Sequence, residues 1–354
     1  MRGVSRFLKV TVGLGGTFAL FLLLLVRYSG SYLGFPTQWK IMFRTPELQQ
    51  VSSSPSALSS ANAGPDGESV GRRFSERKAF LEMMCRRVNL EGKIFSKEFM
   101  DYNKNYRLLV CAPPKTGCTS LKRHLLRLAG FPEEVDVHSD TANEAISVEH
   151  VLGDAVDKVL ESPTTTRVMV ARHPLDRLVS GYRDKFMDGA PVTSDIWVQY
   201  LTEYWRSRGF DTSNLTLTFH QYLEMIAYRM MTRGKNSIDR HFRPTTFVCS
   251  PCTVKYDYIL HTDTLTQDLQ YIAGKLGITG IDLGLRLNAK ADKTLVSSYD
   301  NYYKDIPLSL LRMIYLLYRE DFLINGFELP PVMQSVLHDA KIENLLRYFE
   351  DANK

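Results

Sequence analysis

The chain has 354 residues, of which 44% are hydrophobic and 11% aromatic, as in a globular protein with a substantial core. Lysine and arginine exceed aspartate and glutamate by 44 to 39, which suits an anionic ligand but is far below the charge of a dedicated nucleic-acid binder. Composition and charge therefore exclude a mainly disordered chain and disfavour nucleic acid as a partner.

An apolar segment, Val10–Val26, follows a short basic tail and contains no charged residue. Its length is close to the minimum for crossing a membrane. Basic residues flank it on both sides: Arg2, Arg6, Lys9 and Arg27. A cleaved signal peptide is the alternative, but the apolar run is longer than usual for one and no small-x-small site follows it directly. We expect residues 1–9 to be a cytosolic tail and residues 10–27 a signal-anchor transmembrane helix of a single-pass type II protein.

The next segment is poor in large apolar residues. Residues 45–71 are rich in Ser, Pro, Gly and Ala and cannot bury a core, so residues 28–71 are predicted to form a flexible stem. The composition becomes globular from Arg72 and no second long linker follows. Residues 72–354 are therefore predicted to form one lumenal domain, with a helical tail at residues 331–354 to which no role is assigned.

Two short apolar runs, Tyr106–Cys111 and Arg167–Ala171, are each followed by proline and then by a helical pattern, as is typical of buried strands that lead into loops. Helical spacing recurs along the chain at Glu76–Val88, Thr119–Leu128, Val148–Leu160, Leu175–Phe186, Ile196–Arg206, Phe219–Met231, Leu265–Leu276 and Leu308–Phe322. This alternation predicts an α/β fold, a three-layer sandwich whose central parallel sheet is covered on both faces. Ligands bind beyond the carboxyl ends of the strands in such sheets.

The first predicted strand leads into Pro113–Ser120 (PPKTGCTS), a loop that opens a helix. Unpaired backbone N–H groups at a helix start bind anions. Gly117 allows close approach of the backbone, and Lys115 adds a mobile positive charge. The residues predicted to surround the anion are Pro114, Lys115, Thr116, Gly117, Cys118, Thr119 and Ser120. A plain strand-loop-helix junction is the alternative, and a Walker A loop is excluded because the lysine precedes the glycine.

The second predicted strand ends at Arg172, which can hold a phosphate bidentately. Ser180, about two turns along the following helix, can reach the same group if the helix lies alongside it. A solvated basic helix face is the alternative, but two loops of matched design argue against it. The predicted phosphate-binding residues are Arg172, His173, Pro174, Leu175, Asp176, Arg177, Leu178, Val179 and Ser180.

These residues resemble motifs of the Golgi carbohydrate sulfotransferases that include the chondroitin, dermatan and N-acetylgalactosamine 4-O-sulfotransferases. The first loop of that family is similar to PKVGCTNWK and binds the 5′-phosphosulfate of 3′-phosphoadenosine 5′-phosphosulfate (PAPS). The second is similar to RDPFERLVSAYRDKF and binds the 3′-phosphate. This chain has PKTGCTSLK and RHPLDRLVSGYRDKF. Further matches cover nearly the whole predicted lumenal domain, at Arg240–Pro244, Cys249–Cys252, Tyr256–Tyr258 and Tyr315–Phe327.

The chain departs from the family pattern at four of these positions. Ser120 replaces Asn, Leu121 replaces Trp, His173 stands where an acidic residue is common, and Phe242 stands where Trp is expected. The lysine, arginine and serine that contact the cofactor in the family are all retained, so the departures concern the preference for an acceptor.

The resemblance implies the P-loop-NTPase-like sulfotransferase fold, PAPS as co-substrate with no metal, and a Golgi membrane location. It also implies a glycan or proteoglycan acceptor, for which we expect the 4-position of N-acetylgalactosamine in chondroitin, dermatan or a related carbohydrate. The alternatives are a non-catalytic lumenal lectin and a nucleotide-dependent kinase. A lectin would not need the two loops or the adenosine nucleotide, so a test of cofactor binding distinguishes it from the enzyme, and the missing Walker motif argues against the kinase.

Sulfuryl transfer resembles phosphoryl transfer, in which positioning and electrostatics supply most of the catalysis. Lys115 is predicted to stabilise the leaving 5′-phosphate oxygen, with backbone donors of Gly117–Ser120 around the sulfuryl group. His241 is the candidate base, because its polar, basic loop matches a family motif and a neutral imidazole suits the task. A structural or substrate-binding role for His241 stays open. His124 and His220 fall in helical patterns and are predicted to be structural.

Five cysteines permit up to two disulfides. Cys249 and Cys252 are expected to form a tight bridge, Cys85 and Cys111 are candidates for a second, and Cys118 is expected to be a small buried residue. A zinc site is disfavoured because no second cysteine pair has matching spacing.

One glycosylation sequon, Asn214-Leu215-Thr216, is consistent with lumenal exposure of the domain. The sequence leaves the oligomeric state open.

Overall fold

The structure is a computed structural model that describes residues 67–92, 95–190, 192, 194–209, 215–279, 282, 298–331 and 333. The predicted cytosolic tail, membrane anchor, most of the stem, the sequon asparagine Asn214 and nearly all of the C-terminal tail lie outside these residues. None of the helices formed by the described residues combines the length and hydropathy needed to cross a bilayer.

A sheet of four strands forms the centre of the fold, with β1 (Met100–Asn103), β2 (Leu108–Cys111), β3 (Thr166–Ala171) and β4 (Tyr258–His261) side by side in that order. β2, β3 and β4 are parallel, and β1 pairs with β2 in the antiparallel sense. The predicted parallel sheet is therefore correct for β2, β3 and β4 and wrong for β1, which runs antiparallel at one edge. The carboxyl ends of the parallel strands meet at one edge, where Cys111 pairs with Met169 and Ala171 with His261.

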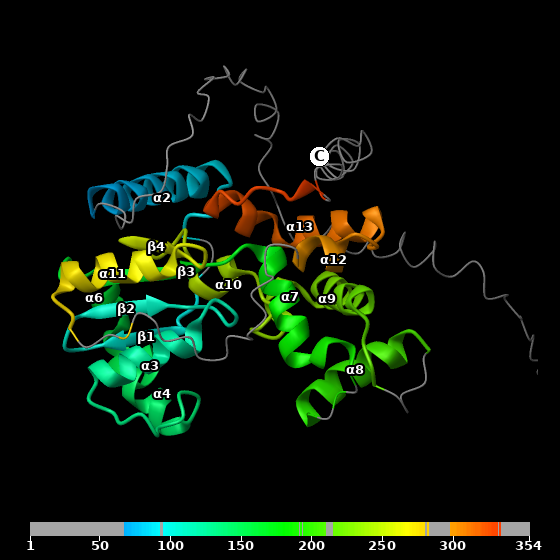
Figure 1. Cartoon of the computed structure of the whole chain (residues 1–354), viewed down its shortest axis with the longest axis horizontal. Coiled ribbons are helices and arrows are strands. Elements are labelled where there is room, and N and C mark those ends of the chain that lie inside the picture. Colours follow the sequence, from blue (N-terminus) through cyan, green and yellow to red (C-terminus); the bar gives the residue numbers. More distant parts are fainter. Residues whose placement is uncertain are drawn as a thin grey trace, which may run out of the picture. The chain divides into compact units, whose positions relative to one another are not determined.

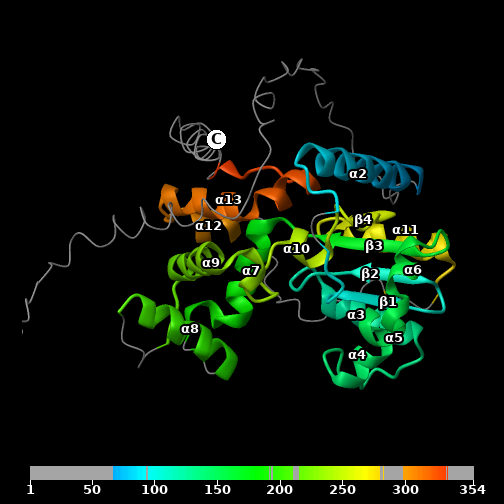
Figure 2. The same ribbon diagram turned by 180° about the vertical axis from the view of Figure 1, so that it is seen from behind.

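Side chains alternate between two cores along these strands, because successive residues of a strand point to opposite faces. Leu109, Met169 and Ile259 pack into one core, whereas Val110 and Val168 pack into the other. The helices that pack on the second face are α3 (Cys118–Leu128), α4 (Asp140–Ile146) and α11 (Leu265–Leu276), and those on the first face include α5 (Val148–Leu152) and α6 (Val156–Glu161). α2 (Gly67–Arg87) lies along β4 and contributes to both cores. Figures 1 and 2 show these layers from opposite sides, and the predicted three-layer sandwich is confirmed.

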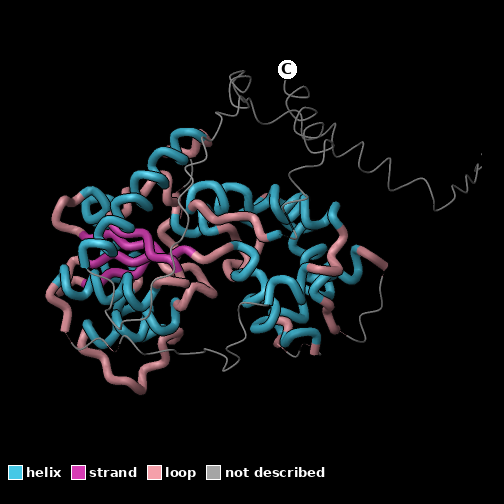
Figure 3. The backbone as a smooth tube through the Cα atoms, turned by 45° about the horizontal axis from the view of Figure 1, so that its top comes forward, coloured by secondary structure: helices cyan, strands magenta, loops and turns pink. Residues whose placement is uncertain are grey.

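A second group of helices lies mainly to one side of the sheet, although two of them also contribute residues to the first core (Figures 1 and 3). It comprises α7 (Pro174–Lys185), α8 (Asp195–Ser207), α9 (Phe219–Arg233), α10 (Thr245–Cys249), α12 (Ser298–Tyr303) and α13 (Leu308–Asn325). Aromatic rings join these helices, and Phe186 stacks on Phe242 with ring centroids 5.8 Å apart. Gly181 of α7 is required by this packing, because a Cβ there would lie 2.9 Å from the Phe242 ring.

Most predicted helices are confirmed to within a few residues at each end. The predicted helix Val148–Leu160 is wrong as one element, because it breaks at Gly153, whose φ of 51° interrupts the helix between α5 and α6. α2 begins at Gly67, within the last residues of the predicted stem. The sequence did not predict β1, β4, α4, α10 or α12.

The disulfides differ from the predicted pairing. Cys85 of α2 is bonded to Cys252, and Cys111 of β2 is bonded to Cys249. The chain turns at Ser250, whose backbone is left-handed with a φ of 50°. We infer that this turn directs the two cysteines of the CSPC segment to different partners, so that the segment fastens both α2 and β2 to the end of α10.

Candidate active site

The two loops singled out in the sequence lie together at the carboxyl edge of the sheet. The PPKTGCTS loop connects β2 to α3, and Arg172 follows β3 directly. Because β2 and β3 are adjacent and parallel, their following loops must meet. They are joined by a hydrogen bond in which Nη1 of Arg172 donates to the Lys115 carbonyl oxygen at 2.8 Å.

The PPKTGCTS loop is held in a conformation that few sequences adopt. Lys115 and Gly117 have φ values of 74° and 89°, and a positive φ is strained for a residue with a side chain. The buried Thr116 hydroxyl donates to the Pro113 carbonyl oxygen at 2.7 Å and so closes the turn. We infer that Thr116 shapes the loop from inside.

A cavity of about 390 Å³ opens over the start of α3, within the range of small-molecule sites. We call it the anion cavity. The predicted site residues that line it are Pro114, Lys115, Gly117, Cys118, Thr119, Ser120, Arg172, Ser180 and His241. Its further lining residues are Leu121, His124, His138, Asp184, Lys185, Leu265 and Leu269. The structure thus brings the lysine loop, the arginine loop and the candidate base into one cavity.

The remaining predicted site residues do not line this cavity: Thr116, His173, Pro174, Leu175, Asp176, Arg177, Leu178 and Val179. The His173 ring lies against Phe322 and Phe327, and its Nε2 is 3.0 Å from the Glu328 carbonyl oxygen. These contacts give His173 a role in packing the end of α13.

Arg177 is a buried cation that connects three segments of the site. Its side chain is 2% exposed. The guanidinium donates to the carbonyl oxygens of Pro114 at 2.9 Å, Arg240 at 2.9 Å and Arg243 at 2.5 Å. It therefore fixes the loop containing Lys115 relative to the loop containing His241, a role that only the folded chain reveals.

Lys115 is paired with a carboxylate inside the cavity. Its Nζ lies 3.2 Å from Oδ2 of Asp184, which is also 3.0 Å from Nζ of Lys185. Burial lowers the pKa of Lys115, and the charge of Asp184 opposes that shift. Ser180 and Asp184 are four residues apart on α7, so they occupy one face of the helix. Asp184 and Lys185 are not among the predicted site residues, although both belong to the RDKF segment of the matching motif.

His241 is oriented by a neighbouring carboxylate. Its Nδ1 lies 2.6 Å from Oδ1 of Asp239, which also accepts a hydrogen bond from the His241 backbone N–H at 2.8 Å. Burial lowers the pKa of His241, and the hydrogen bond to Asp239 opposes that shift. A neutral imidazole held in this way can take a proton through its other nitrogen.

Two further histidines reach the cavity. His138, in the loop between α3 and α4, has its Nε2 3.5 Å from the Thr119 hydroxyl, and burial followed by the charge of Lys122 lowers its pKa. His124 of α3 is buried and also lines the cavity, although its helical position suggested a purely structural role. Nothing in the local sequence distinguished His138.

Cys118 is the unpaired cysteine. It was expected to be a small buried residue, but it is only partly buried at the start of α3, where it lines the cavity.

This arrangement defines an α/β protein in which a strand-loop-helix segment of non-Walker type lines a cavity together with a lysine and an arginine. The family model described as "Sulfotransferase family" matches residues 99–328, and the chain belongs to this family.

Its curated relatives include several carbohydrate sulfotransferases, in agreement with the resemblance seen in the motifs. Human carbohydrate sulfotransferase 9 is 24% identical over 281 residues, which cover 72% of this chain and 60% of the relative. Rat carbohydrate sulfotransferase 11 is 22% identical over 237 residues, which cover 64% of this chain and 66% of the relative. Carbohydrate sulfotransferase 10 of Xenopus laevis is 25% identical over 313 residues, which cover 83% of this chain and 86% of the relative. The match thus spans less than two thirds of the first two relatives. No solved structure matches the chain.

Proposed function

We propose that this chain transfers the sulfuryl group of PAPS to a hydroxyl of a glycan. The observation that carries the proposal is the convergence of Lys115, Arg172 and Ser180 on one cavity at the start of α3. The names of the relatives support a carbohydrate acceptor.

In the proposed mode of binding, the start of α3 and the backbone of Gly117–Ser120 hold the 5′-phosphosulfate. Arg172 and Ser180 hold the 3′-phosphate, for which a guanidinium offers two parallel donors. Leu265 and Leu269 supply an apolar wall to the same cavity. The Lys115 ammonium leaves Asp184 and contacts the oxygen that bridges the phosphate and the sulfate of PAPS.

In the proposed reaction, the acceptor oxygen attacks sulfur as the bond from sulfur to the 5′-phosphate oxygen breaks. His241 takes the hydroxyl proton, and Asp239 stabilises the imidazolium that forms. Lys115 stabilises the negative charge that develops on the leaving oxygen. The products are the sulfated glycan and adenosine 3′,5′-bisphosphate.

We further propose that the acceptor is N-acetylgalactosamine, sulfated at the 4-position within chondroitin, dermatan or a related carbohydrate. We also propose a Golgi location, with the N-terminal segment as a type II membrane anchor. The resemblance of the two loops to the 4-O-sulfotransferases supports the acceptor, and the apolar run of residues 10–26 supports the anchor.

The proposal is tested by incubating the purified chain with sulfur-labelled PAPS and a panel of desulfated glycosaminoglycans. We expect label in chondroitin or dermatan, at the 4-position of N-acetylgalactosamine. Lys115→Ala should lower kcat by about 10²–10³-fold, the cost of losing one donor to a developing oxyanion.

Lys104→Ala is the matched control, because Lys104 is exposed in the turn between β1 and β2 and does not line the cavity. Near wild-type turnover in folded Lys115→Ala would contradict the assignment of the cavity. Glycan binding without any transfer would favour the lectin alternative.

A further inference from the structure

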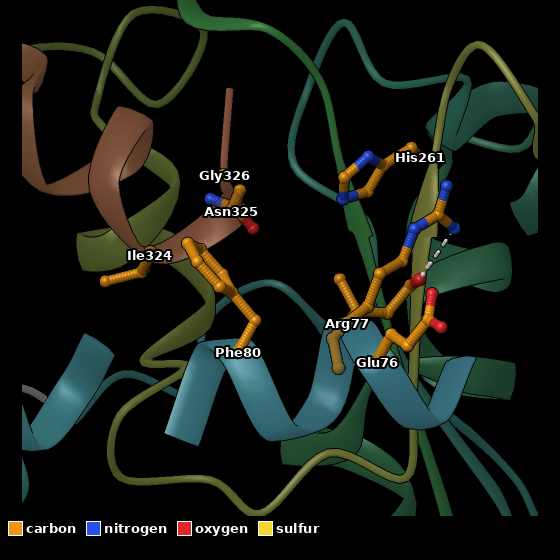
Figure 4. A pocket seen from close by; sticks show the side chains of 8 residues that line it. Glu76, Arg77, Phe80, His261, Ile324, Asn325 and Gly326 are labelled. Atoms are coloured by element: carbon orange, nitrogen blue, oxygen red, sulfur yellow. Dashed lines mark hydrogen bonds between the residues drawn. The ribbon is translucent and has the colours of Figure 1, made fainter. Parts of the chain in front are cut away.

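A second cavity, of about 410 Å³, lies between α2, β4 and the end of α13. We call it the β4 cavity. Its lining residues are Glu76, Arg77, Phe80, Ile259, His261, Ile324, Asn325 and Gly326, and Figure 4 shows them around it. Ile259 and Ile324 belong to the core that contains Met169, whereas Leu265 and Leu269 of the anion cavity pack against the core on the other face. The two cavities therefore share no lining residue and border different cores.

Two side chains of the β4 cavity carry polar atoms that lack a partner among the described residues. Asn325 is only 8% exposed; its Nδ2 donates to the Asp321 carbonyl oxygen at 2.9 Å, but its Oδ1 accepts no hydrogen bond. The Nε2 of His261 is likewise shielded from solvent and unpaired. Figure 4 shows the Asn325 and His261 side chains on the wall of the cavity, from different elements. Buried polar atoms are nearly always hydrogen-bonded to protein or ordered water, so these two atoms are available to pair with a ligand hydroxyl or with water.

The charges in the β4 cavity disfavour an anion. Nη1 of Arg77 donates to Asp268 Oδ2 at 2.8 Å and to the Ile259 carbonyl oxygen at 3.1 Å, and Nη2 donates to Thr264 Oγ1 at 3.0 Å. The guanidinium is thus already engaged. Burial, followed by the charge of Arg77, lowers the pKa of His261 to about 4, so the imidazole is neutral near pH 7. The exposed carboxylate of Glu76 would repel a sulfate or a uronic acid.

The remaining surface of the β4 cavity is apolar. Ile259 and Ile324 form part of the wall, and Phe80 lies at its rim with 38% of its surface exposed. An apolar cavity with a few convergent polar atoms is typical of small-molecule sites. A neutral pyranose matches this combination, because it presents hydroxyl groups at its edges and C–H bonds on its face.

We propose that the β4 cavity is a binding subsite for a neutral hexopyranose residue of the glycan acceptor. A sugar hydroxyl donates to Asn325 Oδ1, another pairs with His261 Nε2, and the C–H face of the ring packs on Phe80. The identity of the ligand as a sugar rests on the proposed function, whereas the site itself rests on the contacts above. The subsite would hold a part of the polymer other than the sugar that receives sulfate.

The experiment measures binding of methyl β-galactopyranoside and the methyl β-glycoside of N-acetylgalactosamine to the full-length chain by saturation-transfer difference NMR. Adenosine 3′,5′-bisphosphate is present throughout, so that the anion cavity is filled. We expect both glycosides to bind, and methyl β-glucuronide to bind at least about tenfold more weakly. Asn325→Leu, which keeps the side-chain size but removes the acceptor, and Phe80→Leu should each weaken binding by about tenfold or more.

Met83→Ala is the matched control, because Met83 is 44% exposed on the same helix and does not line the cavity. Glycoside binding must persist in Met83→Ala. It must also persist in Lys115→Ala, the variant that tests sulfuryl transfer, so that a failure of the subsite and a failure of the proposed function can be told apart.

The subsite is contradicted if neither glycoside binds, or if binding is unchanged in Phe80→Leu. A loss of binding in His241→Ala with wild-type binding in Phe80→Leu would also contradict it, because the sugar would then occupy the anion cavity. Since Phe80 is exposed, Phe80→Leu remains informative even if Asn325→Leu fails to fold.

Discussion

At the scale of single residues, the anion cavity carries an excess of positive charge. Lys115, Arg172 and Lys185 line it together with one carboxylate, that of Asp184. An anionic ligand therefore competes with Asp184 for Lys115, whose ammonium is mobile enough to change partners. The buried guanidinium of Arg177 contacts the loop that contains Lys115 and the loop that contains His241, and its positive charge strengthens the same preference for anions.

The pH dependence of turnover tests the role of His241. In the proposed mechanism the neutral imidazole is the active form, so kcat/KM should rise with pH as His241 loses its proton. Because burial lowers the pKa of His241, the acid limb should lie below the ordinary histidine value of about 6.5. His241→Ala should reduce the rate by about 10²–10⁴-fold and remove that limb.

His220→Ala serves as the control for this profile, since His220 lies on α9 outside the cavity. An unchanged profile in His241→Ala would eliminate His241 as the base. If the limb disappeared only in His138→Ala, the base would be His138.

At the scale of elements, the CSPC segment is the point at which α2, β2 and α10 are covalently joined. Its disulfides close long segments of chain, with sequence separations of 167 and 138 residues. Cross-links that close long loops restrict the unfolded chain most strongly. The segment therefore fixes the sheet against the helix that lies along β4.

We expect Cys111→Ser combined with Cys249→Ser to lower the free energy of unfolding by about 2–5 kcal/mol. Denaturant titration measures this loss, and Cys118→Ser is the matched control because Cys118 is unpaired. Peptide mapping of the unreduced chain should recover Cys85 linked to Cys252 and Cys111 linked to Cys249. A peptide with Cys249 bonded to Cys252 would refute the pairing.

At the scale of the whole molecule, the sequence predicted the parts of the fold that have local signals. The strands β2 and β3 are apolar runs, and the loops after them carry their own glycine, lysine and arginine. β1 was missed because its short sequence MDYN contains Asp and Asn, although all four residues are buried beside β2 and the helices α3, α4 and α5. The contacts of Arg177, the presence of His138 in the cavity and the disulfide pairing were also missed, because each depends on segments that only folding brings together.

In the proposed function, one cavity holds a nucleotide with both a 5′-phosphosulfate and a 3′-phosphate. Calorimetric titration with adenosine 3′,5′-bisphosphate and with ADP, in the absence of metal, tests it most directly. We predict that the 3′,5′-bisphosphate binds at least about tenfold more tightly, because Arg172 and Ser180 contact its 3′-phosphate in the proposed mode of binding, and that Arg172→Ala abolishes this preference. Equal or tighter binding of ADP by the wild-type chain would contradict the account.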